Sequence, residues 1–129
     1  MFTIEHIKSA HSKVSSGADF PKYIQEIKSM GVKNYETFVA DGQTVFNGSD
    51  GYFQALEKKY KELTIAEDAD GHQFIQDLKN HQAGNSDYMT FCMDCAKSGI
   101  MKWIVNTEKM TCAYYDKNSN EIYIEDIPK

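Results

Sequence analysis

Apolar side chains recur at steps of three and four residues along the N-terminal part of the chain. This spacing is typical of amphipathic helices. It predicts one helix capped by Thr3 and a second that begins near Asp19 and Pro21 and ends at Gly31. The segment 15–17, with the sequence Ser-Ser-Gly, is expected to end the first helix. The predicted buried faces are Ile4, Ile7, His11 and Val14 in the first helix, and Phe20, Tyr23, Ile24, Ile27 and Met30 in the second.

The hydrophobic period then changes to two over residues 35–39, as a strand requires. Asp41 and Gly42 form a strong signal for a hairpin turn, and residues 43–46 are the expected return strand. A third helix is predicted from Ser49 or Asp50, with residues 63–66 as an alternative short strand. The side chains expected along one side of this helix are Tyr52, Phe53, Leu56, Tyr60 and Leu63.

The C-terminal half predicts two more helices followed by three strands. Asp70 and Gln73 have the spacing of a capping box, and Gly84 would end the helix that they begin. Asn85 or Ser86 would start the next helix, which ends at Gly99. Its expected inner face is Tyr88, Phe91, Cys92, Cys95 and Ala96, and the strands are expected at 100–105, 110–115 and 121–125.

Helices and hairpins that segregate along a chain favour the α+β class. The sequence therefore predicts a single compact domain over residues 1–129. We expect a mainly antiparallel sheet of about five strands with about five helices packed on it.

The composition of the chain argues against several classes of function. A net charge of −5 without a basic cluster disfavours nucleic acid as a partner. No apolar run reaches the roughly 18 residues of a membrane span, and no secretory signal is visible, so no membrane association is predicted. Three cysteines cannot all pair within one chain, which favours free thiols in a reducing cytoplasm.

Cys92 and Cys95 form a C-x-x-C motif, which suits a redox pair or half of a zinc site. A redox pair usually begins at a helix N-terminus, whereas Cys92 lies more than one turn inside its predicted helix. A zinc site would need Cys112 together with His81 or His72. The sequence contains no second C-x-x-C, so we expect two buried, inert thiols, and we predict no metal and no cofactor.

The sharpest catalytic alternative pairs Cys92 with His81 as a nucleophile and its base. It requires an accessible sulfur within hydrogen-bond reach of the imidazole. The competing interpretation places His81 in the last turn of its helix, where a partly positive ring is favourable.

The turn between the last two predicted helices carries the densest polar cluster in the chain. His81, Gln82, Asp87 and Tyr88 are our candidates for binding a ligand there. Each also has a structural explanation: Asp87 suits a first helical turn, and Tyr88 begins an apolar stripe.

Four segments carry a resemblance to a known family. They are residues 81–92 (HQAGNSDYMTFC), 96–103 (AKSGIMKW), 110–116 (MTCAYYD) and 125–128 (EDIP), and residues 31–35 with the Asp41-Gly42 turn also fit. With these motifs the chain resembles a family of small uncharacterised bacterial proteins, some of which are labelled phage envelope protein. The resemblance extends over essentially the full length. It implies no established activity and transfers no catalytic residues.

The sequence thus favours a binding module for an unknown small molecule or protein partner. A small enzyme that uses Cys92 and His81 is one alternative, and a structural protein of a prophage particle is another. A homodimer is compatible with an open sheet edge or an aromatic face.

Overall fold

The computed structural model describes residues 1–15 and 19–128, so Ser16 and Gly17 of the expected helix stop lie outside the described residues. The described part is an α+β domain with four α-helices and a six-stranded sheet. The helices are α1 (Ile4–His11), α2 (Phe20–Ser29), α3 (Gly71–Gln82) and α4 (Tyr88–Lys97). The strands are β1 (Asn34–Phe38), β2 (Thr44–Asn47), β3 (Phe53–Ala55), β4 (Lys102–Asn106), β5 (Thr111–Tyr115) and β6 (Glu121–Asp126).

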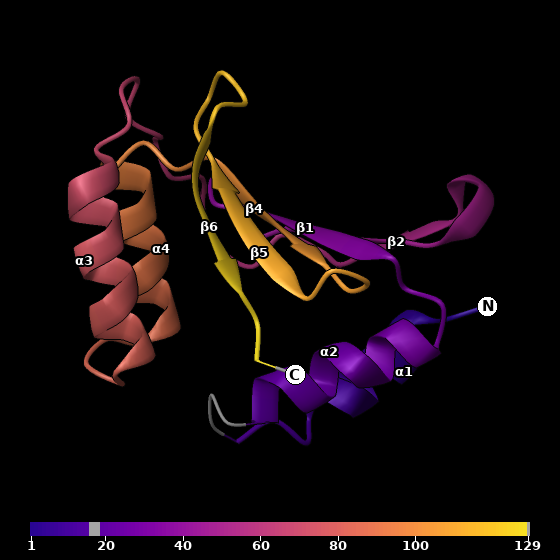
Figure 1. The fold of residues 1–129 in the computed structure, drawn as a ribbon. Coiled ribbons are helices and arrows are strands. Elements are labelled where there is room, and N and C mark those ends of the chain that lie inside the picture. The colour runs from indigo at the N-terminus through magenta and orange to yellow at the C-terminus, as the bar shows by residue number, and fades with distance from the viewer. Residues whose placement is uncertain (16–18, 129) are drawn as a thin grey trace.

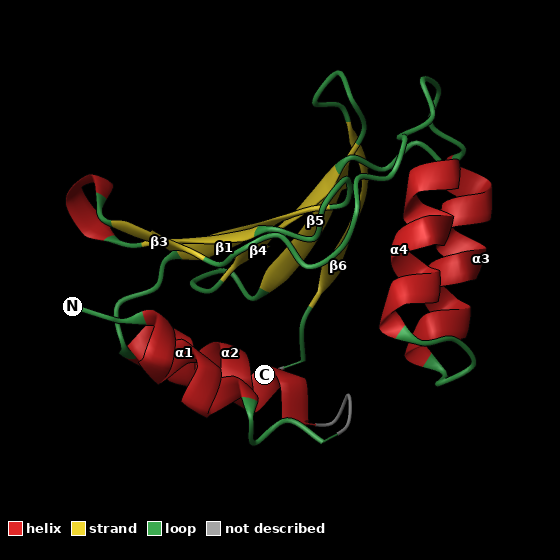
Figure 2. Cartoon of the chain, turned by 180° about the vertical axis from the view of Figure 1, so that it is seen from behind, coloured by secondary structure: helices red, strands yellow, loops and turns green. Residues whose placement is uncertain are grey.

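All neighbouring strands of the sheet are antiparallel, in the order β3-β2-β1-β4-β5-β6. Pairing of β1 with β4 joins the N-terminal half of the chain to the C-terminal half. The α1/α2 pair and the α3/α4 pair lie on the same side of the sheet (Figures 1 and 2), and neither pair covers the opposite face. The predicted fold class is confirmed, although the sheet has six strands where about five were expected and the described helices number four.

Side chains at alternating positions decide which strand residues meet the helices. Trp103 and Val105 in β4 are buried, while their neighbours Lys102 and Ile104 are only half-buried on the other face. In β5, Tyr114 is buried on the helix side and Tyr115 lies on the opposite face, as the sequence predicts for adjacent strand residues.

The helix caps follow the sequence closely. Thr3 Oγ1 accepts a hydrogen bond from the backbone N–H of His6, and Asp70 accepts one from Gln73. Two details were wrong. The cap of α4 is Asp87, one residue beyond the expected start, and His11 is exposed at the end of α1 where a core position was expected.

The third predicted helix does not exist. Residues 49–51 form a single 3₁₀ turn, β3 follows, and residues 56–70 form an irregular segment in which the alternative strand at 63–66 is also absent. Asp50 and Gly51 adopt φ angles of 57° and 80°, which a continuing right-handed helix cannot accommodate. The irregular segment is instead held by tertiary hydrogen bonds. The Tyr60 hydroxyl donates to the Val39 carbonyl, and the Leu63 N–H donates to the carbonyl of Ala40 at 2.7 Å.

Gly99 offers a direct test of how tightly this segment packs. A Cβ at Gly99 would lie 2.6 Å from the Asp68 carbonyl oxygen and 2.8 Å from Ala69 Cα, whereas a Cβ at Gly84 would meet nothing within 4 Å. Both glycines have positive φ, at 77° and 84°. Gly84→Ala should therefore lower the free energy of unfolding by about 1–2 kcal/mol through backbone strain alone. Gly99→Ala should lower it by about 3 kcal/mol or more, because backbone atoms must also move.

Urea unfolding of the two variants, followed by circular dichroism, measures this difference. Equal destabilisation by both substitutions would show that residues 68–69 do not press on Gly99.

Candidate functional site

Two of the turn residues singled out in the sequence make hydrogen bonds within the fold. His81 Nδ1 lies 3.0 Å from the Ser86 carbonyl oxygen and 3.2 Å from Ser86 Oγ, and the imidazole stacks on Phe91 with ring centroids 4.6 Å apart. Gln82 donates to both carboxylate oxygens of Glu125, at 3.0 and 3.2 Å. His81 thus stabilises the turn between α3 and α4, and Gln82 ties the end of α3 to β6.

Asp87 has a structural role as well. Its carboxylate accepts a hydrogen bond of 2.7 Å from the Thr90 N–H, which caps α4. Hydrogen bonding to Thr90 lowers the pKa of the Asp87 carboxyl below its usual value. Of the four turn residues, only Tyr88 turns its side chain toward the centre of the sheet, where its ring meets Trp103 edge to face at 6.4 Å.

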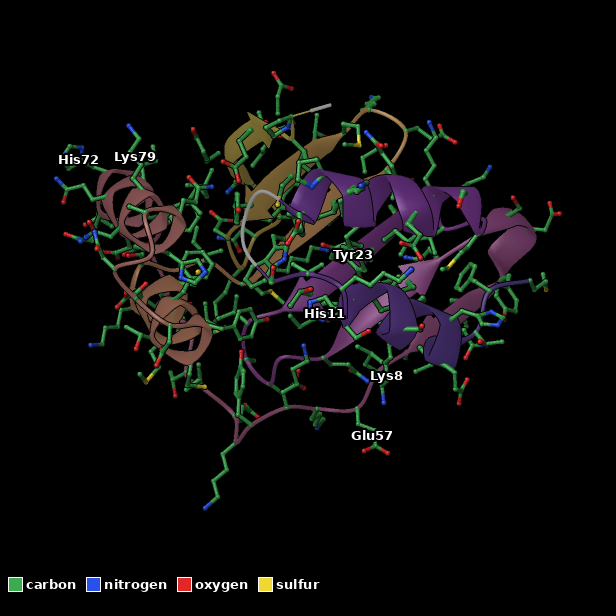
Figure 3. The ribbon with its side chains drawn as sticks, turned by 90° about the horizontal axis from the view of Figure 1, so that it is seen from below. Lys8, His11, Tyr23, Glu57, His72 and Lys79 are labelled. Carbon is green, nitrogen blue, oxygen red and sulfur yellow. The ribbon has the colours of Figure 1, made fainter. Side chains whose placement is uncertain are left out.

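All three cysteines are free and buried. Burial raises the pKa of the Cys92 and Cys95 thiols, and it raises that of Cys112 to about 12. Among the described residues, no group of three or more His, Cys, Asp or Glu side chains is arranged to hold a metal ion. Figure 3 shows His72, the alternative fourth zinc ligand, on the outer side of α3.

Phenols, and not an imidazole, lie beside the Cys92 sulfur. The Tyr60 and Tyr88 hydroxyls and the Lys59 ammonium offset part of the rise in the Cys92 thiol pKa that burial causes. His81 directs Nδ1 at Ser86 instead. The nucleophile and base of the enzyme alternative are therefore not assembled in this structure.

Trp103 is the centre of an aromatic cluster beneath the sheet. Phe91 from α4 lies 5.8 Å from it and Tyr114 from β5 lies 6.1 Å away, as ring-centroid distances. Tyr88 completes the cluster from the start of α4. The cluster forms because α4 packs on the face of the sheet to which Trp103 and Tyr114 point.

Tyr35 extends this aromatic surface toward the α1/α2 pair. It pairs with Val105 in the adjacent strand, so Tyr35 and Trp103 are diagonal neighbours on one face. Burial raises the pKa of the Tyr35 hydroxyl well above its ordinary value, and the nearby Tyr23, Cys112 and Tyr88 raise it further. Side chains from α2, β1, β4 and α4 thus converge at this place.

We call the set Tyr23, Tyr35, Tyr88 and Trp103 the aromatic site. Tyr23, Tyr35 and Trp103 expose only 6%, 7% and 9% of their surface. No hydrogen bond links the two phenol hydroxyls or the indole N–H to any residue that the structure describes, yet none of the fully buried side-chain N and O atoms in this part of the chain lacks a partner. These three polar atoms therefore keep contact with solvent although the rings that carry them are buried.

A lysine and a histidine also lie beside the aromatic site. Lys59 Nζ lies 5.4 Å from the centroid of the Tyr88 ring, and His11 meets Tyr23 edge to face at 5.3 Å (Figure 3). Tyr88 exposes 41% of its surface although its hydroxyl is beside the buried Cys92 sulfur. Tyr88 is thus the most exposed ring of the aromatic site.

Two hollows adjoin the fold. The larger, of about 580 Å³, lies between α1 and α2 and has Tyr23 among its lining residues. The smaller, of about 270 Å³, lies at the β1–β2 turn and is lined by Phe38, Ala40, Asp41, Gln43 and Met101. None of the four turn residues from the sequence lines either hollow.

A family described as protein of unknown function (DUF1398) matches residues 8–126. The chain belongs to this family. No curated protein matches the DUF1398 chain significantly. None of its described helices has the length and apolar character that crossing a membrane requires.

The sequence singled out Tyr88, but it placed Tyr23 only on a buried helix face and Tyr35 only in a strand. The signal available in the sequence was the phenol hydroxyl of each residue. A phenol on a predicted core face brings a hydroxyl that needs a partner. Which phenol hydroxyls lack a hydrogen-bond partner depends on how β1 lies against α2. These two elements meet only in the folded chain.

We expect the three thiols to react slowly in the native protein. Their burial and raised pKa values keep them protonated and shielded at neutral pH. Treatment with a chromogenic disulfide reagent should release little product from the folded protein and three equivalents per chain after addition of denaturant. One thiol that reacts at the rate of a free thiol in the native protein would contradict this.

High pH should destabilise the fold, because the buried phenols then lose their protons. The pKa of Tyr23 is raised from 10.0 to about 12, so its contribution to stability is complete below pH 10 and is lost as the pH rises through 12. Two pKa units correspond to about 2–3 kcal/mol. The Tyr23→Phe variant should therefore lose less free energy of unfolding over this window than the parent chain, by up to that amount. The check is urea unfolding at several pH values; parallel curves for the two proteins would show that folding does not raise the pKa of Tyr23.

Proposed function

We propose that this DUF1398 protein is a binding module that holds a small, planar, uncharged molecule at the aromatic site. The proposal rests on one observation. Tyr35 and Trp103 are more than nine-tenths buried, yet their hydroxyl and indole N–H make no hydrogen bond with any described residue. A ligand with acceptor atoms would satisfy these groups and cover the adjoining rings.

The side chains of the aromatic site favour a planar, uncharged ligand. Aromatic rings offer faces and edges for stacking, and an indole N–H can only donate. Because burial raises the pKa of Tyr23 and Tyr35, both phenols stay protonated and can donate as well. The four side chains of the site carry no full charge and the nearby Lys59 is positive, so a cationic ligand would lose its hydration without gaining a counter-ion beside it.

Binding is better supported than catalysis by Cys92 and His81. The thiol is buried with a raised pKa, and the imidazole is committed to Ser86 and Phe91. Three free thiols support a reducing cytoplasm as the working compartment of this proposal. The prophage-particle alternative, which comes from the resemblance in the sequence, gains no support from a particular feature of the structure.

The single tryptophan of the chain is a built-in reporter for this proposal, since Trp103 belongs to the site. Titration with benzamide or nicotinamide should change Trp103 fluorescence in a saturable manner. Benzamidine, which has nearly the shape of benzamide but carries a positive charge, should bind more weakly. Tyr35→Phe should weaken benzamide binding by about tenfold, the effect of losing one hydrogen bond of about 1 kcal/mol or slightly more.

Tyr115→Phe is the matched control, because it removes a hydroxyl from the opposite face of the same sheet. It should leave the titration unchanged. The proposal fails if none of the neutral probes produces a saturable change, or if Tyr35→Phe and Tyr115→Phe bind them equally well.

A further inference from the structure

Residues 57–64, which we call the strap, are the part of the irregular segment that is held at both ends and exposed in between. Before the strap, the Leu56 N–H donates to the Thr44 carbonyl at 2.8 Å. Beyond it, the Ala66 N–H donates to the Ala96 carbonyl at 2.9 Å. None of the strap side chains themselves is buried.

The hydrogen bonds of the strap to the rest of the described chain all end on residues 39–41. Backbone N–H groups of the strap donate to the carbonyls of Ala40 and Asp41, at distances of 2.7 to 3.4 Å. The Tyr60 hydroxyl donates to the Val39 carbonyl at 2.5 Å. A segment with exposed side chains and few attachments opens at a lower free energy than the whole fold.

Two residues of the strap lie against α4. Lys59 Nζ is 5.4 Å from the centroid of the Tyr88 ring, and the Tyr60 hydroxyl lies beside the Cys92 sulfur. Cys92 has no exposed surface, although Tyr88, one turn earlier on the same helix, exposes 41%. The strap thus contributes to the burial of the Cys92 sulfur and contacts the most exposed ring of the aromatic site.

We infer that the strap opens and closes over Cys92 and Tyr88, and that a ligand enters and leaves the aromatic site while the strap is open. The second step rests on the binding function proposed above, whereas the first does not. The other three rings of the site are more than nine-tenths buried, so part of the structure must move before a planar molecule reaches them. The helices and strands around the site are held by regular backbone hydrogen bonds, whereas the strap forms neither a helix nor a strand.

Tyr60 is the residue through which the strap can be loosened without a change in the aromatic site. Tyr60→Phe keeps the ring and removes the hydrogen bond to the Val39 carbonyl. Tyr52→Phe is the matched control, because the Tyr52 hydroxyl donates to the Phe2 carbonyl at 2.6 Å, outside the strap. Each variant loses one bond between a phenol and a carbonyl, but only the first of these bonds holds the strap closed.

Labelling of the thiols in the full chain with iodoacetamide measures strap opening without any ligand. When opening and closing are faster than labelling, the rate at each cysteine follows the population of the form that exposes it. In the parent protein Cys92 should label faster than Cys95 and Cys112, whose exposure requires a larger unfolding. Tyr60→Phe should raise the Cys92 rate by about fivefold, the effect of losing one hydrogen bond. Tyr52→Phe should leave the Cys92 rate unchanged, and mass spectrometry of the labelled peptides separates the three rates.

Stopped-flow mixing with benzamide, followed by Trp103 fluorescence, tests access to the site. Tyr60→Phe should raise the association and dissociation rate constants by the same factor of about five and leave the Kd unchanged, because the strap controls the route and not the bound state. Tyr52→Phe should leave both rate constants at the parent values.

Equal labelling of Cys92 in the two variants would overturn the inference, because the strap would then not cover the sulfur. Faster labelling of Cys92 in Tyr60→Phe together with unchanged benzamide kinetics would overturn the access step, since the ligand would then use another route. Failure of every neutral probe to bind the parent protein would refute the proposed function and the access step with it. The labelling rates would still decide whether the strap opens.

Discussion

The alternation of side chains between the two faces of one antiparallel sheet is the constraint on which the rest of the structure depends. All four described helices lie on the same side, so a strand residue faces either a helical layer or the side of the sheet that no helix covers. Trp103, Tyr35 and Tyr114 face the helices, while Ile104, Glu36 and Ala113 face away. A shift of one residue in any strand would exchange these two sets and remove both the core and the aromatic site. The pairing of β1 with β4 matters most for this register, because it joins the two halves of the chain.

The position of α4 determines what kind of chemistry the site can support. Cys92 and Cys95 point inward with no exposed surface, and burial raises the pKa of both thiols. Since the thiolate is the reactive form, this packing makes the sulfur atoms poor nucleophiles. The same helix brings Tyr88 against Trp103 and presents a hydroxyl to Cys92. Groups that could look catalytic in the sequence therefore act as packing and hydrogen-bonding atoms, and the polar atoms left without partners belong to aromatic rings.

The sequence predicted those features that depend on neighbours within one or two turns of chain. Thr3 and Asp70 cap helices as expected, and the strands expected at 100–105 and 110–115 are present as β4 and β5. The failure at residues 49–63 has a physical cause. Tyr52, Tyr60 and Leu63 have helical spacing, but their partners are Phe2, Val39 and Ala40, which lie far away in the sequence. Tertiary hydrogen bonds thus overrode a local pattern. The same limitation applies to the site: Tyr88 stood out because its sequence neighbours are polar, whereas Tyr23 influences Tyr35 only once α2 and β1 have packed in the folded chain.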